Sequence, residues 1–108
     1  MGRSWEDFIN GLKDNSGKLA KDELKSLIKW AASEDVDFIR EQGDDLKRYL
    51  TQLANGQITK QQFDGYVRDM KRLARMEALQ GSVAAKAAAQ RLADGIQSLI
   101  IDGLLALV

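Results

Sequence analysis

Apolar residues recur at helical spacing along most of the chain. Four stretches, at about residues 4–13, 19–32, 34–54 and 60–79, place apolar residues three and four positions apart, which is the period of an amphipathic helix. A fifth stretch, residues 81–108, is rich in alanine and then in leucine and isoleucine. No stretch shows the apolar–polar alternation of a strand. The pattern predicts an all-α fold, a helical hairpin or small bundle with a long C-terminal helical arm.

The third stretch has the clearest periodicity. Spacings of 3-4-3-4-3 connect Val36, Ile39, Gly43, Leu46, Leu50 and Leu53. Such a seam needs a partner helix, and the fourth stretch can supply it. We expect the hairpin seam to consist of Val36, Ile39, Leu46, Leu50, Leu53, Phe63, Val67 and Met70, with Tyr66, Leu73 and Ala74 also facing inward. Because an interior glycine costs about 1 kcal/mol in a helix, Gly43 indicates either a close helix crossing or a kink.

Local signals define the junction between the third and fourth helices. Asn55-Gly56 is typical of a helix C-terminus, since glycine adopts the left-handed cap without strain. Thr59 and Gln62 have the spacing of a capping box, and Ile58 and Phe63 that of a hydrophobic staple.

Two other boundaries are less sharply defined. Ser33, followed by acidic residues at positions 34, 35 and 37, predicts the start of the third helix, because carboxylates in a first turn oppose the helix dipole. Gly81 leaves two alternatives open: the fourth helix ends there, or one long helix continues through it. We therefore divide the chain into a helical core, residues 1–80, and an arm, residues 81–108, that belongs to the same domain or is continuous with the fourth helix.

The amino-acid composition limits the kinds of catalytic and metal-binding site that the chain can form. The chain has 108 residues, with sixteen Lys and Arg against sixteen Asp and Glu, and it contains no Pro, Cys or His. One small domain is expected at this length. Disulfides, thiol chemistry, imidazole metal sites and Ser-His or Cys-His catalysis are excluded. We can name neither a nucleophile with an adjacent base nor a cofactor motif, so we expect no enzyme activity and no cofactor.

Two stretches share a glycine-containing frame. Residues Gly17–Leu24 and Gly56–Phe63 both read G-x-[LI]-x-K-x-[EQ]-[LF], which resembles the second half of an EF-hand loop. Calcium needs six to eight oxygen ligands, including the first and twelfth loop positions. The first copy has Leu12 at position 1, and the second has Gln62 in place of the bidentate glutamate. We therefore predict no metal site, and keep a metal-free EF-hand-like helix pairing as the alternative fold.

Residues 46–73 carry a further resemblance. A leucine-bearing helix is followed by the sequence Gly56-Gln57-Ile58-Thr59, then by Gln62-Phe63 and a second amphipathic stretch. This segment resembles the short C-terminal (SHOCT-like) domain, a helix-turn-helix motif. The resemblance covers about a quarter of the chain and implies a role in oligomerisation and partner contact.

A local surplus of positive charge lies in the fourth helix. Seven basic and three acidic residues lie between Lys60 and Arg91, although the whole chain is neutral. The residues that could contact an anion are Arg68, Lys71, Arg72 and Arg75. No aromatic residue is interleaved for base stacking, so we do not expect nucleic-acid binding. We expect instead a solvated face that pairs with the acidic third helix.

The C-terminal tract, Ile96–Val108, is apolar over most of its circumference, and Asp102 is its one charged residue. At about 1.5 Å per residue it reaches about 20 Å, short of a bilayer core of about 30 Å. Such a helix has to be buried, and we expect its burial between subunits. The predicted self-association interface is Ile96, Leu99, Ile100, Ile101, Leu104, Leu105 and Leu107.

These observations predict a non-catalytic helical protein that acts as a scaffold or adaptor through protein–protein contact and self-association, with a homo-oligomer as the expected form. The alternative is a peripheral membrane protein that associates through the apolar C-terminal helix, and the third is a degenerate EF-hand-like calcium sensor. We expect a cytoplasmic location, because the sequence shows neither a signal peptide nor a membrane-spanning tract.

Overall fold

The structure is a computed structural model that describes residues 4–13 and 19–108, and the described residues are helical with no strand. The elements are α1 (Trp5–Asn10), α2 (Lys21–Ala32), α3 (Asp37–Ala54), α4 (Lys60–Gln80), α5 (Val83–Gly95), the π-helix η1 (Ile96–Leu104) and α6 (Leu105–Leu107). The protein is therefore an all-α small bundle.

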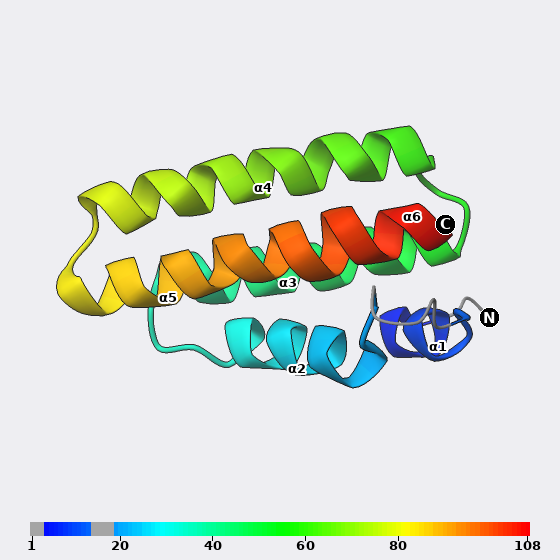
Figure 1. Cartoon of the computed structure of the whole chain (residues 1–108), viewed down its shortest axis with the longest axis horizontal. Helices are drawn as coiled ribbons and strands as arrows, with labels where there is room; N and C mark the ends of the chain where they lie inside the picture. Colours follow the sequence, from blue (N-terminus) through cyan, green and yellow to red (C-terminus); the bar gives the residue numbers. More distant parts are fainter. Residues whose placement is uncertain (1–3, 14–18) are drawn as a thin grey trace.

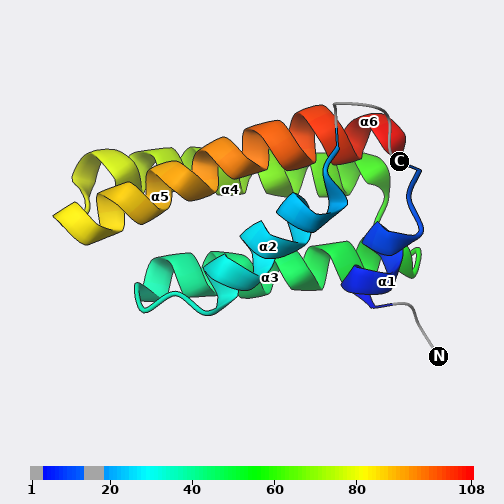
Figure 2. The ribbon, with the colours of Figure 1, turned by 60° about the horizontal axis from the view of Figure 1, so that its bottom comes forward.

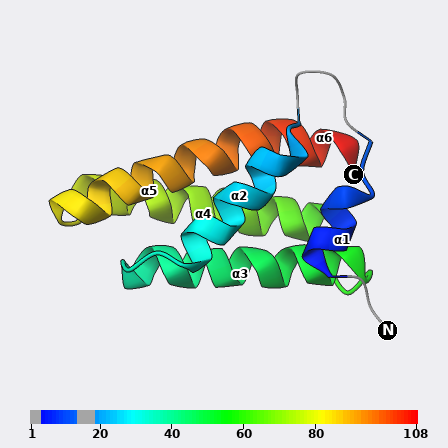
Figure 3. The ribbon, with the colours of Figure 1, turned by 90° about the horizontal axis from the view of Figure 1, so that it is seen from below.

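Two long helical segments lie side by side. α4 runs antiparallel to a single rod made of α5, η1 and α6 (Figure 1). α3 lies beneath this pair, and α2 crosses between α3 and the rod (Figures 2 and 3). α1 packs against α3 near the end where the rod finishes. One core joins these layers, with Ile9, Leu24, Ile39, Phe63 and Ile100 all fully buried in it.

The apolar seam of α3 packs among four neighbouring helices, α1, α2, α4 and α5. Ile39, Leu46 and Leu50 are fully buried, whereas Val36 and Leu53 are partly buried against the core. Gly43 lies against α2, where a Cβ atom would come within 2.4 Å of the Ala32 backbone nitrogen. Since α3 is one uninterrupted helix, Gly43 marks a close crossing with α2 and no helix break.

The junction between α3 and α4 has the predicted caps. Thr59 Oγ1 accepts a hydrogen bond from the Gln62 backbone N–H (3.1 Å), and Gln62 Oε1 accepts one from the Thr59 N–H (2.8 Å). At the end of α3, Gly56 has a φ of +72°. Its N–H bonds to Leu53 O (3.2 Å) while the Gln57 N–H bonds to Gln52 O (2.9 Å), which is the Schellman arrangement. The capping box is confirmed.

The predicted start of the third helix at residue 34 is wrong. Ser33 instead ends α2, because its backbone N–H bonds to the carbonyls of Lys29 and Trp30 and its hydroxyl donates to Trp30 O (3.1 Å). α3 begins at Asp37, with Val36 in the N-cap position and no side-chain cap. The acidic residues at positions 34 and 35 thus belong to the connection.

The chain reverses direction at Gly81. α4 ends at Gln80, and Ser82 begins α5 by accepting a hydrogen bond from the Ala85 N–H (3.3 Å). Of the two alternatives that the sequence left open, the structure has the helix break. The C-terminal segment therefore folds back along α4 (Figure 1).

Candidate functional site

The C-terminal tract lies inside the protein's own fold. Ile96, Ile100 and Leu104 have no exposed surface, and Leu105 is 8% exposed. Leu99, Ile101 and Leu107 are partly buried and pack against the same core. Four of the seven residues predicted to form a subunit interface are therefore buried within one chain, and the other three keep part of their surface exposed.

Two physical factors explain this difference from the expectation. η1 is a π-helix, whose i→i+5 hydrogen bonds put more residues in each turn than an α-helix has. Side chains four and five positions apart, such as Ile96, Ile100 and Leu105, then share one face. In addition, α4 and α2 both contact η1, so neighbours cover it on two sides.

The most exposed large apolar side chains lie elsewhere, on the last turns of α4 and at the start of α5. We call this surface the apolar tip; its members are Leu73 (46% exposed), Met76 (48%), Leu79 (78%) and Val83 (88%). The turn of the α4–α5 hairpin, drawn in yellow, projects beyond α2 and α3 in Figure 1 and again in Figure 3. The tip thus presents apolar side chains to solvent at one extremity of the molecule.

The sequence analysis did not identify this tip. It placed Tyr66 and Leu73 inward, whereas they are 37% and 46% exposed, and the Tyr66 ring stacks on Tyr49 with centroids 4.7 Å apart. A helical-wheel projection of α4 contains the signal that separates the exposed apolar residues from the buried ones. At about 100° per residue, Leu79 lies well over 90° from the buried stripe that contains Val67 and Ala74.

The predicted anion-contact residues lie on one face of α4. Arg68 pairs with Asp64 (Nε–Oδ1 2.7 Å) and Arg72 with Asp69 (3.1 Å). Lys71 Nζ donates to Gln97 Oε1 of η1 (2.7 Å), which ties α4 to the rod.

The fourth residue, Arg75, has no ion pair with any described residue. The ion pairs on this face are internal to α4, so the expected pairing with the acidic third helix is not found among the described residues. The side chains of Arg68 and Arg72 are also 52% and 72% exposed, so their ion pairs contribute little to stability.

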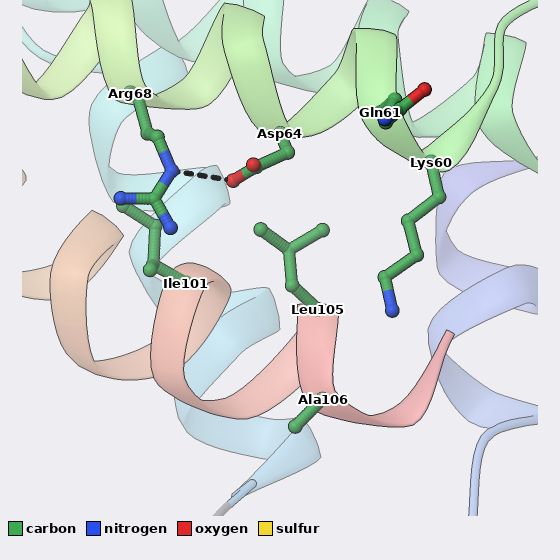
Figure 4. Close-up of a pocket in the computed structure, with 7 residues that line it drawn as sticks. All are labelled: Lys60, Gln61, Asp64, Arg68, Ile101, Leu105 and Ala106. Atoms are coloured by element: carbon green, nitrogen blue, oxygen red, sulfur yellow. Dashed lines mark hydrogen bonds and ion pairs between the residues drawn. The ribbon is translucent and has the colours of Figure 1, made fainter.

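Two hollows follow this face. The first, about 490 Å³, lies between the start of α4 and the end of the rod, with Lys60 and Arg68 beside Ile101, Leu105 and Ala106 (Figure 4). The second, about 390 Å³, is lined by Arg68, Lys71, Arg72, Arg75, Met76 and Leu79. Arg68 lines both, so the two hollows are neighbours along α4.

The structure describes the second EF-hand-like stretch and only part of the first. In the second stretch, Gln62 is used as a cap for Thr59. Gly17 and Lys18 of the first stretch lie outside the described residues. Among the residues that the structure does describe, no three Asp or Glu side chains gather in a group that could hold a metal ion.

Within the described part of the chain, no helix combines the length and the apolar content needed to cross a bilayer. Comparison of the sequence with models of known families and with curated proteins, and of the fold with solved structures, found no match.

Proposed function

We propose that this is a non-catalytic contact protein, a small helical scaffold or adaptor that acts through protein–protein contact and self-associates through its apolar tip. The observation that supports the proposal most directly is the exposure of Leu79 and Val83 at the end of a projecting hairpin. The proposal moves the contact surface from the C-terminal tract, which the core covers, to the α4–α5 turn.

The tip has an energetic reason to be covered. Full burial of one large aliphatic side chain contributes about 1.5–3 kcal/mol relative to its exposure. Four such side chains lie within eleven residues of chain, from Leu73 to Val83. Clustered exposed apolar groups are typical of interaction surfaces, whereas single ones are not. A second copy is the partner that is always present at the same concentration, and most soluble oligomers are homo-oligomers.

Two substitutions test this surface directly. In Leu79→Lys/Val83→Lys, both changes fall on highly exposed side chains, so the fold is retained while the tip becomes charged. The matched control is Gln57→Lys/Gln61→Lys, which adds the same charge at exposed sites near the opposite end of α4.

Sedimentation velocity is then measured from about 1 to 300 μM, a range that covers micromolar affinities. We expect the wild type and the control to form dimers or larger species and the tip variant to stay monomeric. A wild type that is monomeric throughout this range contradicts self-association. If such a monomer co-sediments with anionic vesicles and the tip variant does not, the surface contacts lipid instead of protein.

A further inference from the structure

The two hollows beside α4 form one strip. Lys60 lies at one end and Leu79 at the other, and Arg68 belongs to both hollows. Nineteen helical steps of about 1.5 Å separate the two ends, so the strip is about 28 Å long. That length matches five turns of a second α-helix laid against α4.

The strip is positively charged. Five cations line the two hollows, Lys60, Arg68, Lys71, Arg72 and Arg75, against one carboxylate, Asp64. Lys60 and Arg75 have no ion pair with a described residue, and Lys71 bonds to an amide oxygen, which leaves its charge uncompensated. Three of the five are arginines, whose planar guanidinium groups suit carboxylates.

Apolar side chains alternate with these cations. Ile101 and Leu105 reach into the first hollow from the rod, and Leu105 points toward α4 in Figure 4. Met76 and Leu79 provide apolar surface in the second. The strip is therefore complementary to a ligand that carries both carboxylates and aliphatic groups along one face.

We propose that the strip binds an acidic amphipathic helix of a partner protein. Such a helix places aliphatic residues at i, i+3, i+4 and i+7 into the hollows and carboxylates beside Lys60, Lys71 and Arg75. The inference rests on the proposed function only in that it concerns protein contact. It does not need self-association, and because Met76 and Leu79 belong to both surfaces, self-association through the tip competes with helix binding at that end of the strip.

A second copy of this chain and a membrane fit the strip less well. Two α4 faces brought together would place their cations against each other. The exposed carboxylates of α3, at Asp37, Glu41 and Asp44, are accompanied by no exposed large apolar side chain on that helix. A flat anionic membrane contacts a concave strip poorly.

The probe is a labelled synthetic helix of about 20 residues, with leucines at helical spacing and glutamates flanking them, and binding is followed by fluorescence anisotropy with the full chain. A sequence-scrambled peptide of identical composition is the control ligand. The test variant is Lys60→Glu/Arg75→Glu. The control variant is Lys86→Glu, an exposed cation on α5 that lines neither hollow.

We expect the patterned peptide to bind and the scrambled one to bind more weakly. Reversal of the two unpaired charges should weaken binding about tenfold, since two exposed ion pairs with the peptide are lost and reversal adds repulsion. Lys86→Glu should leave binding within about twofold.

Three results would overturn this assignment: no binding of the patterned peptide, equal binding of the scrambled peptide, or equal losses in the two variants. Vesicles of phosphatidylserine and phosphatidylcholine are run in parallel. Binding of vesicles without binding of the peptide would assign the strip to lipid. Sedimentation velocity of the two charge variants should give the oligomeric state of the wild type. A variant that loses peptide binding but keeps this oligomeric state affects the strip alone, so the two proposals can fail independently.

Discussion

Two glycines in neighbouring helices have opposite environments. A Cβ atom on Gly43 would lie 2.4–2.8 Å from backbone atoms of Ala31 and Ala32, whereas a Cβ atom on Gly65 would meet nothing within 4 Å. Gly43→Ala should lower the free energy of unfolding by about 1–3 kcal/mol, because α2 has to move away from α3. Gly65→Ala should raise it by about 0.5–1 kcal/mol, because alanine loses less conformational entropy in a helix.

Urea denaturation of the two variants provides the measurement. Both variants replace a helical glycine by alanine, so helix propensity changes in the same way in each. A difference in sign between their changes in the free energy of unfolding therefore reports the close helix crossing at Gly43. Two variants that are both stabilised would show that α2 and α3 are further apart than the structure places them.

At the scale of the element, the start of α4 is the best-specified boundary. The capping box supplies two hydrogen bonds, and Phe63 is fully buried beneath it. Thr59→Ala should cost about 1 kcal/mol, the usual value for loss of an N-cap. Phe63→Ala should cost about 3–5 kcal/mol, since it removes a large core side chain. Equal and negligible shifts in urea denaturation would mean that the junction does not anchor the hairpin.

The same elements show what a local sequence pattern can predict. The cap at Thr59 depends on residues three positions apart, so the sequence contains all of the partners, and the structure has the predicted bonds. Ser33 shows the opposite case. It has the residue type of an N-cap, but its backbone N–H and its hydroxyl complete the end of α2. Only the structure shows that residues 33–36 connect α2 to α3.

For the whole molecule, the structure separates apolar residues that hold the fold from apolar residues that face solvent. Ile100 is fully buried, and Leu79 is 78% exposed. Ile100→Ala should lower the free energy of unfolding by about 2–5 kcal/mol. Leu79→Ala should change it by no more than about 0.5 kcal/mol. Thermal and urea denaturation at low protein concentration measure both values without a contribution from association.

A larger loss in Leu79→Ala than in Ile100→Ala would contradict this assignment. It would mean that the tip contributes more to the stability of the fold than Ile100 does and that the C-terminal tract is accessible to solvent. A large loss in both variants would indicate that subunit contact through the tip is needed for stability even at low concentration.

The sequence by itself determined the helical class, the approximate position of each helix and the cap at Thr59, because periodicity and capping involve residues that are close along the chain. It also located the basic residues Arg68, Lys71, Arg72 and Arg75 on one stretch of helix. The tertiary structure decided which apolar residues are covered. The reversal at Gly81 brings α4 alongside the rod and leaves Leu79 and Val83 at an exposed end. The i→i+5 hydrogen bond from the Leu105 N–H to Ile100 O puts these two side chains on one face, toward the core. Burial depends on neighbours that are distant in sequence, so only the packed fold determines it.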